Sequence, residues 1–230
     1  MPGPRASAPA MARIGLLGGS FNPAHGGHRR IALEAMRVLE LDEVWLLVSP
    51  GNPLKEGTKD MAPFEARFAS AERIARGTRL RVSDFERREG TRYTTDTVKR
   101  LKQRHPGARF IWLMGADTLR DFHKWRNWRG LARQVPIAVI SRPGYDRHAH
   151  AARAMGWLRR FVHPSSQAKR WTEWSAPAIL FLRLPLDPTS ATAIRAHNPN
   201  WHCRPEPRER AQSRALSPFS TRRPLDRTSR

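Results

Sequence analysis

Residues 15–28 read GLLGGSFNPAHGGH, and this stretch sets the pattern from which the fold is predicted. A short apolar run at residues 13–17 ends at two glycines, and apolar residues then recur at helical spacing over residues 27–41. Asn22 suits a helix N-cap and Pro23 suits the first helical position, so we expect the helix to begin at these two residues. The stretch therefore predicts a strand, a glycine turn and a helix in succession.

The alternation of strand-like and helix-like segments continues along the chain. Further apolar runs occupy residues 44–48, 110–114, 137–140 and 179–184, and a weaker strand pattern occupies residues 80–85. Helical patterns occupy residues 63–76, 94–104 and 149–160. Because strands that are apolar throughout are buried on both faces, the pattern predicts a doubly wound parallel sheet in an α/β domain. Ligands of such sheets bind beyond the carboxyl ends of the strands, close to the point where strand order reverses.

The two ends of the chain differ from the middle in composition. Residues 1–12 contain no apolar stretch of signal-peptide type, and we expect a disordered leader there. Residues 198–230 are rich in Pro, Arg, Ser and Glu and lack an apolar period, so we expect a basic tail that is mostly disordered. The sequence thus predicts one folded domain over residues 13–197.

Composition narrows the class of protein. The chain has 230 residues, of which 39% are hydrophobic, and this is enough for one domain with a sizeable core. Cys203 is the single cysteine, so no disulfide can form within the chain, and we expect a cytoplasmic protein. No apolar run approaches the roughly 20 residues that a membrane span needs.

The net charge of +22 is extreme, and such a charge attracts polyanions such as nucleic acids or phosphorylated metabolites. Only six of the 42 basic residues are lysines, and an arginine surplus of this kind is also typical of genomic codon bias. The basic residues are spread along the chain, whereas a dedicated nucleic-acid-binding protein more often concentrates them. An arginine-rich nucleic-acid-binding protein stays open as an alternative.

His25 and His28 lie three residues apart, which places them on the same face of a helix. Their imidazoles would lie close to the unpaired N–H groups at the start of that helix, and Gly18 and Gly19 would let an anion approach the backbone closely. These features predict a pocket for a polyphosphate. Two alternatives are a pair of surface histidines without function and a zinc site, which would need further ligands.

The stretch GGSFNPAHGGH resembles the G-x-F-[DN]-P-x-H-x-G-H signature of the HxGH nucleotidyltransferases. Residues 189–195, TSATAIR, are similar to the second motif of that family, [IV]-S-[SA]-[ST]-x-[IL]-R, except that Thr189 replaces an apolar residue. The resemblance implies a Rossmann-like nucleotidyltransferase fold with catalytic His25, His28 and Arg195. It also implies that ATP or its phosphates contact Gly18, Gly19, Ser20, Phe21, Ser190 and Thr192.

Four intermediate segments resemble, in the same order, those of nicotinate mononucleotide adenylyltransferases. They are SPGNPLK at residues 49–55, RYTTDT at 92–97, MGADTL followed by Trp125 at 114–125, and SRPGY at 141–145. The resemblance places Lys55 near substrate phosphate and assigns the mononucleotide to Thr94, Asp117, Trp125 and Arg142. Simpler interpretations remain: Trp125 in the core, where its flat ring would pack rather than stack on pyridine, Thr94 and Asp117 as helix caps, and Lys55 in solvent.

The implied reaction joins ATP and nicotinate mononucleotide to give deamido-NAD (nicotinate adenine dinucleotide) and pyrophosphate, a step of NAD biosynthesis. The resemblance implies Mg²⁺ as the cofactor, bound mainly through the substrate phosphates. Pantetheine-phosphate adenylyltransferase, or another HxGH nucleotidyltransferase, is the alternative within the superfamily. It shares both end motifs but leaves the segments at residues 92–97 and 114–125 unexplained.

Overall fold

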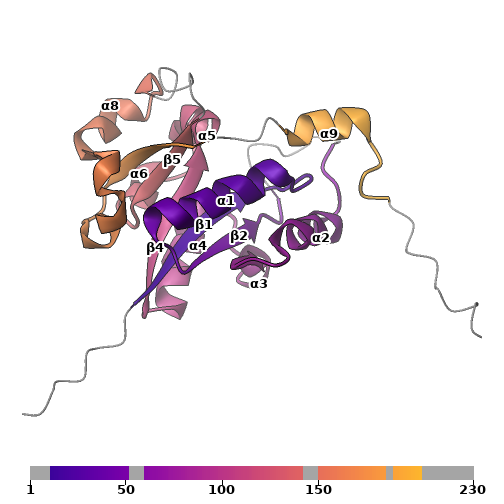
Figure 1. The fold of residues 1–230 in the computed structure, drawn as a ribbon, viewed down its shortest axis with the longest axis horizontal. Helices are drawn as coiled ribbons and strands as arrows, with labels where there is room; N and C mark the ends of the chain where they lie inside the picture. Colours follow the sequence, from indigo (N-terminus) through magenta and orange to yellow (C-terminus); the bar gives the residue numbers. More distant parts are fainter. Residues whose placement is uncertain (1–10, 52–59, 142–149, 185–188, 204–230) are drawn as a thin grey trace, which may run out of the picture.

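The structure, a computed structural model, describes residues 11–51, 60–141, 150–184 and 189–203. Within these ranges seven strands form one sheet in the order β3-β2-β1-β4-β5-β7-β6, and every neighbouring pair is parallel (Figure 1). The strands are β1 (Ala12–Gly19), β2 (Glu43–Val48), β3 (Leu80–Ser83), β4 (Ala108–Gly115), β5 (Ile137–Ser141), β6 (Val162–His163) and β7 (Ile179–Arg183). The predicted parallel sheet is confirmed.

Helices cover both faces of the sheet, so the fold is doubly wound. One face packs against α1 (Gly26–Leu39), α2 (Phe64–Ala75) and the 3-10 helix η4 (Ser165–Glu173). The other packs against α3 (Phe85–Arg88), α4 (Thr94–Arg104), α5 (Ala116–Asp121), η2 (Phe122–Lys124), α6 (Trp128–Ala132), α8 (Met155–Leu158) and η3 (Arg159–Phe161). The last helix, α9 (Ala191–His197), lies beside the amino end of α1 (Figure 1).

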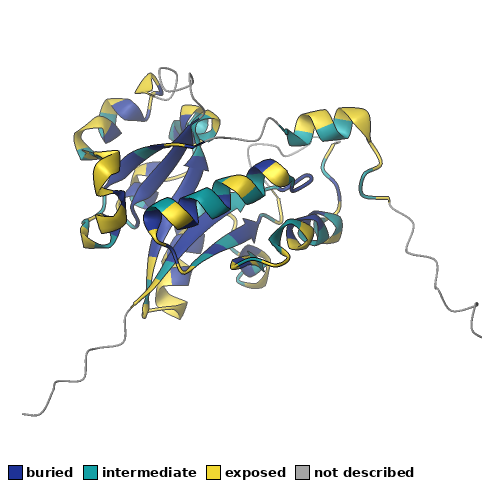
Figure 2. Cartoon of the chain, in the orientation of Figure 1, coloured by how far each residue is buried: buried dark blue, intermediate teal, exposed yellow. Residues whose placement is uncertain are grey.

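The two faces explain why the strands are apolar throughout. Successive side chains of a strand point to opposite faces, so Leu16 joins the core beneath α4 and α6 while Leu17 joins the core beneath α1. Figure 2 shows the strands buried and the outer surfaces of the helices exposed. The apolar runs thus report a sheet that is covered on both sides.

The strand order places the carboxyl ends of β1 and β4 at the centre of the molecule. The chain leaves β1 through β2 to β3 at one edge, and then returns to β4 on the other side of β1. This reversal is the topological switch point at which ligands of doubly wound folds bind. The HGGH segment follows β1, Gly115 is the last residue of β4, and Asp117 follows that strand.

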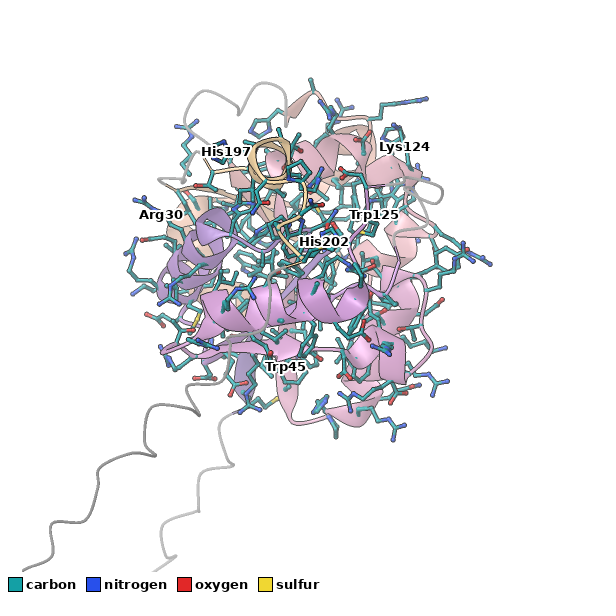
Figure 3. The ribbon with its side chains drawn as sticks, turned by 90° about the vertical axis from the view of Figure 1, so that its right-hand side faces the viewer. Arg30, Trp45, Lys124, Trp125, His197 and His202 are labelled. Atoms are coloured by element: carbon teal, nitrogen blue, oxygen red, sulfur yellow. The ribbon has the colours of Figure 1, made fainter. Side chains whose placement is uncertain are left out.

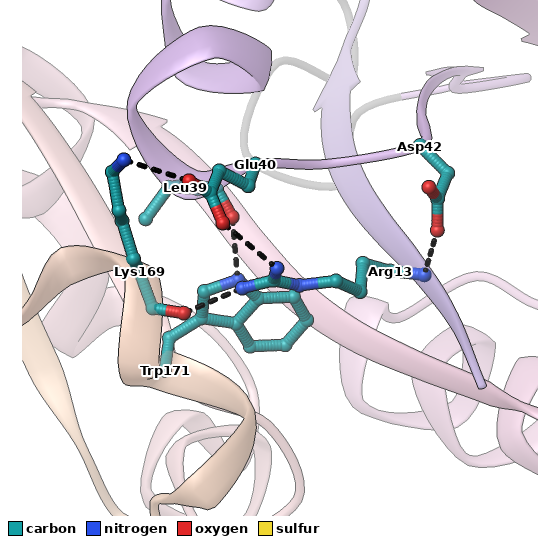
Figure 4. Close-up of polar contacts among 6 residues, drawn as sticks. All are labelled: Arg13, Leu39, Glu40, Asp42, Lys169 and Trp171. Carbon is teal, nitrogen blue, oxygen red and sulfur yellow. Dashed lines mark hydrogen bonds and ion pairs between the residues drawn. The ribbon is translucent and has the colours of Figure 1, made fainter. Parts of the chain in front are cut away.

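A polar network fixes the opposite end of β1 (Figure 4). The helix α1 is followed by its C-cap Glu40, which adopts a left-handed conformation with φ of 51°. Its carboxylate forms ion pairs with Lys169 at 2.7 Å and Arg13 at 3.3 Å, and the hydrogen bond from Lys169 is the first cause that lowers the pKa of Glu40. The buried Trp171 donates its Nε1–H to the Leu39 carbonyl at 3.0 Å, so η4 is attached to the end of α1.

Some strand boundaries differ from the prediction. The strand expected over residues 80–85 ends at Ser83, because the Ser83 hydroxyl accepts the Phe85 N–H at 3.2 Å and the chain turns into α3. The two-residue strand β6 is too short to produce an apolar pattern and was not predicted. The first strand begins at Ala12, inside the expected leader.

The helix expected over residues 149–160 is wrong in extent. Among residues 150–160, which the structure describes, the helical residues are His150, the four-residue α8 and the start of the 3-10 turn η3. Ala154 precedes α8 without a side-chain cap, and Gly156 has a low helix propensity, so little local energy favours a longer helix.

The ends of the chain fall mainly outside the described residues. This holds for residues 1–10 of the expected leader and residues 204–230 of the expected tail, so their disorder stays a prediction. Across the four described ranges, we find no helix that combines the length and apolar character needed to cross a bilayer.

Candidate active site

The helix that carries the HGGH segment begins at Gly26, and His25 is its N-cap. The prediction that Asn22 caps this helix and that Pro23 opens it is therefore wrong. Asn22 is buried, and its side chain instead donates to the Asp60 carbonyl at 2.6 Å and accepts the Ala62 N–H at 3.2 Å. The amide is thus committed to the chain before α2, and a histidine ring takes over the capping role.

The helix start fixes the proton position on both imidazoles. The Gly27 N–H donates to His25 Nδ1 at 3.1 Å, and the His25 N–H donates to His28 Nδ1 at 3.3 Å. Because a backbone N–H can only donate, each Nδ1 is an acceptor, and a neutral ring must carry its proton on Nε2. The two rings are in contact, with centroids 3.9 Å apart, so both Nε2–H donors belong to one small region at the start of α1.

His28 is neutral over the physiological pH range. Burial is the larger cause, and the neighbouring His25 the smaller, of a pKa lowered from 6.5 to about 3. Although the residue keeps some exposed surface, its ring packs between His25 and the buried Phe21, whose ring centroid is 5.0 Å away. His28 therefore offers an uncharged N–H donor.

The glycines at the end of β1 differ in what they do. A Cβ on Gly18 would meet the Trp112 ring at 2.5 Å and 2.9 Å, whereas a Cβ on Gly19 would meet the Phe21 ring at 3.4 Å, which is ordinary contact. The structure thus gives Gly18 a packing role besides the expected approach of an anion. Phe21 is 2% exposed with φ of 48°, so only its backbone is placed to meet a phosphate.

Gly27 brings the second motif close to the first. A Cβ on Gly27 would meet the His25 ring at 2.9 Å and the Thr189 carbonyl oxygen at 3.3 Å, so the absence of a side chain allows this approach. Thr192 follows on the exposed surface of α9. The start of α1 and the segment before α9 are therefore neighbours in space, although they lie far apart in the sequence.

Arg195 completes the convergence of the two motifs. Ser190 caps α9, since its Oγ accepts the Ala193 N–H at 3.1 Å. One helical turn later, Arg195 donates from Nη1 to the Asn22 carbonyl at 2.6 Å and from Nε to Asp60 Oδ2 at 2.7 Å. The guanidinium thus lies against the loop that leads to His25.

Arg67 on α2 organises the same loops and was not predicted. Its side chain is 2% exposed and donates to the carbonyls of Ser20 at 2.7 Å, Ser49 at 2.7 Å, Pro50 at 3.2 Å and Ala62 at 3.0 Å. It therefore ties the ends of β1 and β2 together, and its burial lowers its pKa from the ordinary value. Its position on the apolar face of the helix predicted over residues 63–76 was the sequence feature that could have indicated a buried arginine.

Trp125 lies beyond β4 and is half-buried. Its ring packs edge-on against Trp112, with centroids 6.1 Å apart, and against Phe122 at 5.4 Å. Figure 3, which views the molecule from the side where α9 lies, shows Trp125 to one side of α9 and Arg30 to the other. The core anchors the ring without covering it, so the packing and stacking interpretations are compatible.

Asp117 and Thr94 are not helix caps. The N-cap of α5 is Gly115, and the exposed Asp117 lies in the first turn, where its carboxylate occupies the space that a Cβ on Gly115 would need. The N-cap of α4 is Tyr93, and Thr94 is the first helical residue. Lys55 and Arg142 lie outside the described residues.

Beneath the start of α4 lies a buried carboxyl, Glu86, which was not predicted from the sequence. Burial raises its pKa from 4.5 to about 7, although the Thr97 hydroxyl donates to Oε1 at 3.1 Å. The Thr91 N–H donates to the Glu86 carbonyl at 3.0 Å, and the hydroxyls of Thr91 and Thr97 are 3.0 Å apart. This cluster shapes the turn that precedes Tyr93. Glu86 stands among charged neighbours, so no pattern marked it as buried.

The chain matches the family model described as cytidylyltransferase-like over residues 16–197, a range that contains both motifs. Fold and site together define a nucleotidyltransferase. A relative from Erythrobacter litoralis, described as a probable nicotinate-nucleotide adenylyltransferase, is 54% identical over 195 residues, or 85% of this chain and 89% of that relative. A relative from Gluconobacter oxydans with the same description is 54% identical over 183 residues, or 80% and 93% of the two chains. The chain belongs to the nicotinate-nucleotide adenylyltransferase family.

Solved structures agree with the fold. A nicotinic acid mononucleotide adenylyltransferase from Plasmodium falciparum, complexed with NaAD, superposes with a TM-score of 0.59 at 17% identity. The match covers 80% of this chain and 83% of that chain. At this identity the likeness shows a shared fold, while the family rests on the sequence relatives.

Proposed function

We propose that this protein joins ATP and nicotinate mononucleotide to give deamido-NAD and pyrophosphate in NAD biosynthesis. One observation carries the proposal: Arg195 of the second motif donates to the Asn22 carbonyl at 2.6 Å, in the loop that ends at His25 and His28. This contact supports a single site that both motifs would share at the reversal of strand order, where ligands of doubly wound folds bind. The named relatives support the choice of substrates.

The chemistry needs no protein nucleophile. A phosphate oxygen of the mononucleotide attacks the α-phosphorus of ATP in line, a new P–O bond forms, and the bond to the leaving pyrophosphate breaks. The attacking phosphate is already ionised, so no side chain has to remove its proton. The protein must hold two anions together and stabilise the charge that develops on pyrophosphate.

The geometry supports distinct roles for the catalytic residues. The Nε2–H groups of His25 and His28 would donate to phosphate oxygens. Because His28 is neutral, it would donate this hydrogen bond without placing a positive charge beside the His25 ring. Arg195 would supply the positive charge and charge-assisted hydrogen bonds. The remaining contacts with ATP are assigned to Gly18, Gly19, Ser20, the backbone of Phe21, Lys55, Ser190 and Thr192.

The mononucleotide is assigned to the other side of the switch point. The uncovered part of the Trp125 ring would stack on the pyridine ring, and the exposed carboxylate of Asp117 after β4 would bind ribose. Thr94, at the start of α4, and Arg142 would contact the nicotinate and phosphate groups.

Mg²⁺ is the proposed cofactor, and it would neutralise phosphate charge when bound. Among the described residues no three His, Cys, Asp or Glu side chains form a metal-binding group, so the phosphates of ATP would be its main ligands. We also propose a cytoplasmic location, where ATP is available. The charge of +22 then acts on phosphorylated substrates, and we assign no nucleic-acid partner.

The test incubates the purified protein with ATP, Mg²⁺ and one acceptor at a time: nicotinate mononucleotide, nicotinamide mononucleotide or phosphopantetheine. Pyrophosphate release is measured, and the product is identified by mass spectrometry. We expect the highest kcat/KM with nicotinate mononucleotide and a product with the mass of deamido-NAD. Release only with phosphopantetheine, or salt-sensitive RNA binding without any release, would overturn the proposal.

A further inference from the structure

The catalytic arginine is carried by a helix with little packing of its own. α9 has seven residues, and none of them is buried. A free arginine side chain holds about 2 kcal/mol of rotamer entropy, so a precise position for its guanidinium needs other contacts. Ser190 fixes the start of α9 but lies five residues before Arg195.

Two residues from other segments hold the guanidinium, and we call Asn22, Asp60 and Arg195 the arginine brace. Asp60 Oδ2 accepts from Arg195 Nε at 2.7 Å, and the Asn22 carbonyl accepts from Nη1 at 2.6 Å. The Asn22 side chain closes the cycle by donating to the Asp60 carbonyl at 2.6 Å. Three segments that are distant in sequence therefore meet in one ring of hydrogen bonds.

We propose that Asp60 is a positioning residue that orients Arg195 for adenylyl transfer, an inference that rests on the proposed function. Arg195 has five N–H donors, and the two brace contacts use two of them. Three donors remain for phosphate oxygens, so the brace does not have to open when the triphosphate binds. The hydrogen bond to the Asp60 carboxylate is also directional, and it therefore limits the orientations that the plane of the guanidinium can take.

Burial separates the two partners of Arg195 as experimental targets. Asn22 is 6% exposed and makes two hydrogen bonds to the chain before α2, so replacing it threatens the local fold. The side chain of Asp60 is 69% exposed, and that of Arg195 is 20% exposed. Asp60→Asn keeps the shape of the side chain and should leave the folded state intact, but it removes the charge that strengthens and aligns the hydrogen bond from Arg195 Nε.

The kinetic test measures pyrophosphate release by the Asp60→Asn variant with ATP and nicotinate mononucleotide. A misoriented guanidinium lowers kcat, and we expect a loss on the order of 10- to 100-fold. The KM for ATP should not rise, since a negative charge beside the triphosphate is removed. The matched control is Glu173→Gln on η4, which removes a carboxylate from an exposed pair with Arg170 of the same 2.7 Å length. Wild-type kcat in Asp60→Asn would overturn the proposal.

A double-mutant cycle tests whether Asp60 acts through Arg195. Arg195→Ala should lose most of the rate, and adding Asp60→Asn should cost nothing more, because the residue that it positions is already gone. If the two losses instead multiply, Asp60 acts independently of Arg195, and the proposal is wrong. The unfolding midpoint of each variant is measured alongside, and a merely structural role would lower it.

A spectroscopic arm separates failure of the brace from failure of the proposed function. The Arg195 Nε–H resonance, assigned from its loss in Arg195→Lys, should be shifted by the carboxylate in wild type and should move in Asp60→Asn. If wild type releases no pyrophosphate while this resonance moves, the proposed activity fails and the brace stands. If the resonance is unchanged in Asp60→Asn, the brace itself is refuted, whatever the activity.

Discussion

Replacing His28 should make the protein less sensitive to acid. The pKa of His28 is about 3 in the folded protein and 6.5 when the ring is free. Between these values only the unfolded state binds the proton, so the stability contributed by this ring is complete above pH 6.5 and is lost as pH falls towards 3. At about pH 5.5, one unit below the free value, wild type should have lost about 1.4 kcal/mol relative to pH 7.5 through this ring alone.

The assay is urea denaturation of wild type, His28→Gln and His28→Leu at both pH values. Other titrating groups cancel when the change in unfolding free energy of each variant is subtracted from that of wild type. Both variants lack the ring, so both differences should equal about 1.4 kcal/mol. Glutamine and leucine differ in polarity and would make different contacts. If both variants nevertheless give the same difference in unfolding free energy, the effect comes from titration of the ring and not from lost contacts. If wild type and variants lose equal stability on acidification, His28 titrates at an ordinary pKa and its description as a neutral donor is wrong.

Three further predictions concern packing, a buried acid and substrate binding. Gly18→Ala should cost about 1–3 kcal/mol and alter the near-ultraviolet circular dichroism, because its methyl group enters the Trp112 ring, whereas Gly19→Ala should change little. Glu86→Gln should exceed wild type in urea stability above about pH 7, by up to about 3 kcal/mol, and match it below pH 4.5, because the raised pKa makes ionised Glu86 destabilising; equal curves would contradict this. Trp125→Ala should remove a stacking energy of about 1–3 kcal/mol from the binding of nicotinate mononucleotide, and the KM for this substrate should rise by the corresponding factor. The KM for ATP should stay unchanged, and equal rises in both KM values would refute stacking.

The fold was predictable because each strand carries its own evidence. Five of the strands, β1, β2, β4, β5 and β7, are apolar runs with buried residues on both faces, and residues such as Leu16 and Leu17 must both be apolar for that reason. Helix α4 was predicted with its observed bounds, since His105 and Pro106 end it. Boundaries failed where local energy was weak, as at α8, or where a side chain turned the chain, as at Ser83.

The site was predictable only in part. Motif spacing brought His25, His28 and Ser190 into view, and the described contacts place them as a cap, its partner and a second cap. The role of Asn22 was mistaken because an asparagine that suits a cap can equally bind a distant backbone, and only the fold brings Asp60 within reach. The role of Arg67 was not predicted for the same reason, since its four carbonyl partners come from three segments that only the fold brings together.

The most direct measurement is pyrophosphate release by His28→Ala beside wild type, at saturating ATP and nicotinate mononucleotide. If His28 and Arg195 act on one triphosphate, kcat should fall on the order of 10²–10³-fold while the protein remains folded by circular dichroism. Near-normal turnover by the folded variant would show that the start of α1 does not take part in the reaction.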